Sequence, residues 1–257
     1  MVIAAYDGME NKKKLAKFYL DKANILVSVK NYEEAILYYK YGSTLAEEIV
    51  SKEYTIHNCK LVASYLFFQA NYYEEIGQYD LAYAKFRSVP RYISEWSNQF
   101  CDSEVTKLLA GTYEKLAEYY FYKSTNYGID YLLTDALAKG TYSLELFISI
   151  IKRQLAADLC YGVVQAGITL TILWLLQKNQ EEAKECLKHV KHALKKGIML
   201  IQLSGEEDDS MIGKMQLIRT IEQQYIEKKT YDTEKLFLLF HNYLYGGNAS
   251  KHKNCIP

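Results

Sequence analysis

The sequence predicts an all-α protein, a solenoid of about ten helices that form a single domain. Only two prolines and 13 glycines occur among the 257 residues, so residues that break helices or form tight turns are scarce. Apolar residues recur at helical spacing along almost the whole chain, and no alternating apolar and polar run stands out. Hydrophobic residues make up 49% of the chain, which is ample material for a core.

The first part of the chain divides into helical segments that are separated by short polar or turn-forming residues. Gly77 is expected to terminate the third segment as a C-terminal cap, because glycine adopts the left-handed conformation at no steric cost. Pro90 is expected to stop the fourth segment, and residues 91–100 are predicted to be irregular. The predicted helices are 10–29, 32–50, 55–76 and 79–89.

The second part begins where Asp102 and Ser103 can cap a helix. The predicted helices are 102–124, 126–151, 154–177, 180–203, 211–228 and 232–245, with a polar loop at 204–210. The most apolar run, 166–176, has 11 residues, too few to span a bilayer, and is interpreted as part of a buried central helix. One domain is expected over 1–245, with a C-terminal helical cap at 204–245 and a disordered tail at 246–257.

A repeated pattern links segments that are far apart in the sequence. Ala35 and Ala82 are 47 positions apart, and each follows an Asn/Gln-Tyr pair by three residues and precedes an aromatic residue by four. A third copy contains Ala183, again 47 positions after Ala136, the nearest equivalent in a degraded copy. The residues matched before the turn are Leu26, Tyr73 and Trp174, and those matched after each alanine are Tyr39, Phe86 and Leu187. Small residues are expected where paired helices cross, and large residues are expected to fill the space beside them.

This pattern resembles the tetratricopeptide repeat, whose usual period is 34 residues. The longer period, and the order of segments in the C-terminal third, resemble the soluble NSF attachment proteins (SNAPs) and their huntingtin-associated relatives. The resemblance covers roughly residues 10–245 in architecture, and its motifs are degenerate. It implies a right-handed α-solenoid of long helix pairs closed by a C-terminal helical bundle. It also implies a protein-binding adaptor or scaffold that acts in vesicle traffic or a large assembly.

Composition and motifs narrow the function classes. The net charge is zero, which gives no electrostatic case for nucleic acid. The five cysteines form no CxxC pair, and the N-terminal residues are too polar for a signal peptide, so a reduced, cytoplasmic protein is expected. No nucleotide-binding, hydrolase or metalloprotease motif is present, so no enzymatic activity and no cofactor are predicted. Two alternatives stay open: a regulator that senses a peptide in its groove, and a helical enzyme.

Three clusters of polar residues are candidates for a site. The lysines of segment 180–203 are predicted to bind an acidic partner helix or an anionic membrane surface, the alternative being an ordinary solvated face. Cys186, His189 and His192 lie at helical spacing, but a surface face is preferred to a zinc site, which needs a fourth ligand. The acidic residues 206–209 are interpreted as a charge cap for the next helix. The predicted binding residues are Lys184, Lys188, Lys191, Lys195 and Lys196.

Overall fold

The computed structural model describes residues 8–100, 102–127, 131–204, 209–227, 235–236 and 238–239. Within these residues the protein contains helices and no strand, which confirms the predicted all-α class. The chain forms two compact units, Met1–Leu116 and Ala117–Pro257. The predicted domain bounds and the C-terminal tail stay predictions, and residues 246–257 lie outside the described part of the chain.

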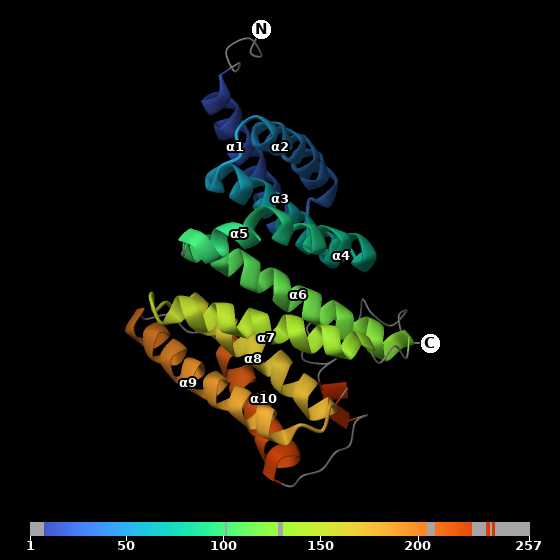
Figure 1. Cartoon of the computed structure of the whole chain (residues 1–257), viewed down its shortest axis with the longest axis vertical. Coiled ribbons are helices and arrows are strands. Elements are labelled where there is room, and N and C mark those ends of the chain that lie inside the picture. Colours follow the sequence, from blue (N-terminus) through green and yellow to red (C-terminus); the bar gives the residue numbers. More distant parts are fainter. Residues whose placement is uncertain are drawn as a thin grey trace. The chain divides into compact units, whose positions relative to one another are not determined.

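The first unit is built from consecutive helices that pack against their neighbours (Figure 1). Its helices are α1 (Met9–Ser28), α2 (Tyr32–Lys52), α3 (Ile56–Glu75), α4 (Tyr79–Ser88), α5 (Pro90–Phe100) and the first part of α6 (Ser103–Tyr127). The irregular segment predicted at 91–100 is wrong, since these residues belong to α5. Pro90 is the first residue of that helix. At this position the backbone N–H has no partner within the helix, so the missing N–H of proline costs no hydrogen bond.

The second unit continues α6 and adds four further α-helices. They are α7 (Tyr131–Ile151), α8 (Ala157–Leu176), α9 (Gln180–Ser204) and α10 (Asp209–Ile221), followed by a π-helical segment, Glu222–Glu227. The helix predicted to begin at Asn126 is wrong at its start, because Asn126 lies in α6 and α7 begins at Tyr131. The predicted final helix at 232–245 is described at only four residues, all of them helical.

The three aligned copies share one turn in the structure. Lys30, Gly77 and Lys178 each adopt a left-handed conformation, with φ of 61°, 77° and 59°. In each turn the next backbone N–H donates to the carbonyl five residues before it, at 2.8 to 2.9 Å. The accepting carbonyls belong to Leu26, Tyr73 and Trp174, the residues that the sequence aligned. This is the Schellman motif, so the repeat read from side chains is confirmed by backbone geometry.

The alanines of the repeat are buried, as expected of small residues at a helix crossing. Ala35, Ala82 and Ala183 are at most 2% exposed. The large residues one turn later, Tyr39, Phe86 and Leu187, are also buried. Because alanine presents only a methyl group, the paired helices can approach closely while these larger side chains fill the space beside the crossing.

Hydrogen bonds between tyrosines and neighbouring helices cross the core of the first unit. The Tyr39 hydroxyl on α2 donates to Asn24 Oδ1 on α1 at 2.7 Å, and the Tyr65 hydroxyl on α3 donates to the carbonyl of Ala16. Gln69 Nε2 donates to the carbonyl of Tyr39 at 3.1 Å. The Tyr65 ring lies against Gly42, where an added Cβ would fall 1.8 Å from the hydroxyl oxygen. Tyrosine therefore supplies both apolar bulk and a polar tie between helices.

Candidate protein-binding surface

The predicted lysine cluster lies on α9, whose opposite face is packed into the second unit. Asn179 begins the helix by accepting a hydrogen bond from the Glu182 backbone N–H at 3.3 Å. Gly167 of α8 allows α9 to come close, since a Cβ there would meet Val190 at 2.4 Å. The buried stripe consists of Ala183, Cys186, Leu187, Val190, Ala193, Leu194 and Gly197. The lysines therefore occupy the remaining, outward side of the helix.

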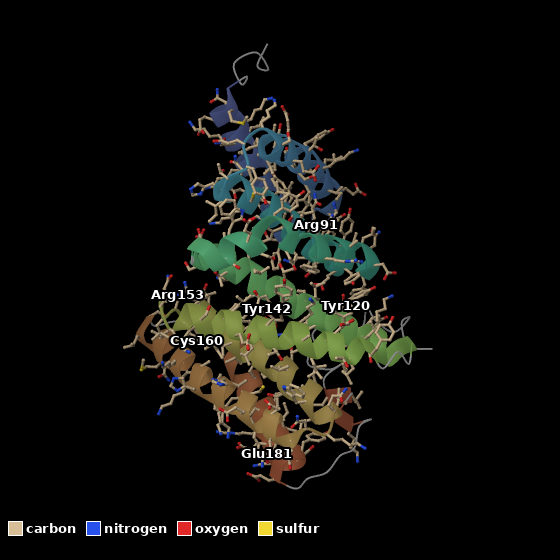
Figure 2. The ribbon with its side chains drawn as sticks, viewed as in Figure 1. Arg91, Tyr120, Tyr142, Arg153, Cys160 and Glu181 are labelled. Atoms are coloured by element: carbon tan, nitrogen blue, oxygen red, sulfur yellow. The ribbon has the colours of Figure 1, made fainter. Side chains whose placement is uncertain are left out.

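Three of the five predicted lysines are engaged by carboxylates of the same chain. Lys184 Nζ lies 2.8 Å from Glu181 Oε1, one turn earlier, and Figure 2 labels Glu181 in the first turn of α9. Lys188 Nζ lies 2.5 Å from Glu185 Oε2. Lys191 pairs with Glu222 in the π-helical segment, so it ties α9 to the element that follows α10. The N-terminal half of α9 is consequently close to neutral.

The ion pair between Lys188 and Glu185 shifts the pKa values of both side chains. The Lys188 ammonium hydrogen-bonds the carboxylate of Glu185 and holds the pKa of that carboxyl below its ordinary value. The same hydrogen bond raises the pKa of Lys188 above its ordinary value. Both side chains face solvent, so the pair keeps its charges but adds little to folding stability.

Lys195 and Lys196 differ from the other three lysines. Neither forms an ion pair with any residue in the described part of the chain. Lys195 is exposed and Lys196 is half-buried. They share one face of α9 with an exposed histidine and two exposed apolar side chains, of which Leu203 is 78% exposed. We call this face the α9 patch; its residues are His192, Lys195, Lys196, Met199 and Leu203.

The three candidate zinc ligands, Cys186, His189 and His192, differ in their exposure to solvent. Cys186 points into the packed side of α9, and burial raises the pKa of its thiol to about 12. His189 and His192 are exposed. No group of three or more potential metal-ligating side chains occurs among the residues that the structure describes. The acidic residues 206–208 lie outside those residues, and α10 begins at Asp209.

The apolar helix α8 is longer than the run that marked it in the sequence. It has 20 residues, and by length and composition it is the one described helix apolar enough to cross a membrane. Its length alone therefore does not exclude a span, contrary to the sequence argument. Of its apolar window, 78% is buried inside the protein, as in the core helix of a soluble fold.

A buried lysine connects α8 to α10. Lys214 Nζ lies 2.9 Å from Gln165 Oε1 and 4.4 Å from the centroid of the Tyr161 ring. Gln180, at the start of α9, donates to the carbonyl of Ile226 in the π-helical segment at 2.7 Å. These polar contacts hold α10 and the segment after it against α8 and α9. The sequence offered no signal for them, because the partners are more than 40 positions apart.

Comparison with known proteins shows no family for this chain. No family profile matches the sequence, and no curated protein matches it. Among solved structures it is similar to a de novo designed helical repeat protein, with 14% sequence identity and a TM-score of 0.28. That match covers 90% of this chain and 99% of the designed one. The helical-repeat architecture is shown by the recurring turns and the buried alanines described above.

Proposed function

We propose that this protein is a cytoplasmic adaptor or scaffold that binds an acidic partner protein through the α9 patch. The observation that carries the proposal is the pair of cations on the patch, Lys195 and Lys196, which have no acidic partner in the described part of the chain. An unpaired basic surface beside exposed apolar side chains complements a helix with acidic and apolar residues on one face. The five patch residues are spaced so that they follow one face of α9.

Ion pairs within the chain reduce the number of α9 lysines that are expected to bind a partner. Lys184, Lys188 and Lys191 already have carboxylate partners, so a foreign acid would have to compete with an existing ion pair. Lys195 and Lys196 require no such exchange. The contact is therefore expected in the C-terminal half of α9. The finer proposal is a SNAP-like, right-handed solenoid with a C-terminal bundle that acts in vesicle traffic or in a large helical assembly.

The test compares the intact chain with a double charge reversal. Lys195→Glu with Lys196→Glu is expected to weaken capture of the partner from a cell lysate about tenfold, because two attractive contacts become repulsive. Lys184→Glu with Lys188→Glu is the matched control, since it reverses two lysines of the same helix outside the patch. Cross-linking mass spectrometry on the captured complex should place the cross-links on α9.

The proposal predicts two further signatures. Capture by the intact chain should weaken as salt rises, because exposed charges are screened. Met199→Ser should weaken it without changing that salt dependence. Cross-links that fall mainly outside α9, or a captured set that the double reversal leaves unchanged, would exclude the α9 patch as the binding surface.

A further inference from the structure

The outer face of α1 presents apolar residues that no other described helix covers. Phe18, Ile25 and Val29 are 57%, 61% and 66% exposed, and their spacing places them along one stripe. The opposite face of the helix is packed through Ala16, Leu20, Ala23 and Leu26. The residues that pack α1 into its own unit therefore lie on one face, and the exposed stripe takes no part in that packing. Figure 1 shows α1 and α2 side by side, in the blue part of the chain.

Two opposite charges lie at the middle of this stripe. Asp21 and Lys22 fall between Phe18 and Ile25, and neither forms an ion pair with a residue in the described part of the chain. Lys22 Nζ lies 5.9 Å from the centroid of the Tyr38 ring on α2, which holds it near the edge of the stripe. The face is thus mixed in charge, unlike the basic α9 patch.

We propose that this face binds the same face of a second copy of the chain, with the two α1 helices antiparallel. A two-fold axis that passes between Asp21 and Lys22 sets Asp21 opposite Lys22 of the partner subunit, and the symmetry makes that pair twice. The same axis sets Phe18 opposite Ile25 of the partner subunit, also twice. Such self-complementarity is what an isologous dimer contact requires.

The charge order favours a second copy over a foreign partner. An acidic partner helix or an anionic membrane would bring negative charge against Asp21, at the centre of the apolar stripe. A second copy of the chain instead places Lys22 of the partner subunit against Asp21, with no rearrangement of the α1 face. Lys14 then falls opposite Val29 of the partner subunit, where its aliphatic stem can cover the valine while its ammonium reaches solvent.

The test measures self-association of the full chain by sedimentation velocity over a wide range of concentration. The wild-type chain is expected to form a dimer. Asp21→Lys or Lys22→Asp alone should weaken it about tenfold, because both symmetry-related pairs become like-charged. The combined swap, Asp21→Lys with Lys22→Asp, restores opposite charges across the axis and is expected to recover wild-type association. Glu33→Lys, on the exposed face of α2, is the control for the same change of charge elsewhere.

A second variant tests the apolar part of the contact. Phe18→Ser with Ile25→Ser should abolish the dimer while leaving the helical circular dichroism unchanged, since both side chains are already largely exposed. A chain that stays monomeric at every concentration overturns the proposal. So does a dimer that ignores both the charge reversals and the serine variant. Binding of a monomeric chain to anionic vesicles or an acidic helical peptide through Phe18 would also overturn it, by assigning the face to a foreign partner.

Discussion

The left-handed residues in the three repeated turns offer a direct test of the repeat. Two of the three turns place a lysine where the third has glycine, with φ of 61° at Lys30 and 59° at Lys178. A residue with a Cβ in this conformation is disfavoured by about 1 to 2 kcal/mol. Glycine removes that penalty but gives the unfolded chain more freedom, which offsets about 0.4 to 1 kcal/mol. The backbone gain expected from glycine over a residue with a Cβ at position 178 is therefore about 0.5 to 1 kcal/mol.

The measurement must separate backbone strain from the lysine charge. A cation near the C-terminal end of α8 interacts favourably with the helix dipole, so removing the ammonium costs a few tenths of a kcal/mol by itself. Lys178→Ala removes the charge and keeps the strain, and it is the proper reference for Lys178→Gly. Thermal unfolding should show the glycine variant about 1 to 4 °C above the alanine variant. Gly77→Ala should shift the unfolding temperature in the opposite direction. If Lys178→Gly is no more stable than Lys178→Ala, the left-handed turn is not strained and the reasoning fails.

Three further predictions concern buried contacts. Gly42→Ala should destabilise the first unit by about 1 to 3 kcal/mol in urea unfolding, because the new Cβ meets the buried Tyr65 ring. Gly213→Ala is the control and should not be destabilising, because a Cβ there meets nothing within 4 Å. Tyr39→Phe should lower the free energy of unfolding by about 1 kcal/mol in the same assay, since it removes the 2.7 Å hydrogen bond to Asn24. An unchanged urea midpoint would show that water replaces this hydrogen bond without loss of stability. The pKa of Cys186, raised to about 12, implies that the unfolded chain loses its thiol proton at lower pH than the folded chain. Stability should therefore fall between about pH 9 and 12. Cys186→Ala should make that fall shallower in chemical unfolding at alkaline pH, and an unaltered slope would contradict the assignment.

The helical periodicity predicts most of the helices, and α5 (Pro90–Phe100) is the exception. Pro90 is predicted from the sequence to end a helix, but proline is equally suited to the first position of a helix. The apolar spacing does continue past it, because Val89 and Ile93 are both fully buried and lie one turn apart. The sequence therefore contains a signal for α5, namely helical spacing of buried residues that continues through Pro90.

The candidate site could be predicted only in part. Lys184 and Lys188 are predicted from the sequence to bind a partner, yet each pairs with a glutamate three residues before it, a spacing at which side chains of one helix meet. The partner of Lys191 is 31 positions away and becomes a neighbour only when the segment after α10 packs against α9. Identifying Lys195 and Lys196 as the remaining cations therefore required the tertiary structure.

The tyrosine hydrogen bonds between α1, α2 and α3 constrain how this sequence can change over time. Apolar contacts between helices tolerate exchange of one aliphatic residue for another, because the neighbours can repack. A hydroxyl that donates to one particular carbonyl, as Tyr65 does to Ala16, fixes the relative register of two helices. Substitutions on α3 are thus expected to be accepted only together with compensating changes on α1. Homologues of this chain should show correlated variation between helices that are not consecutive in sequence.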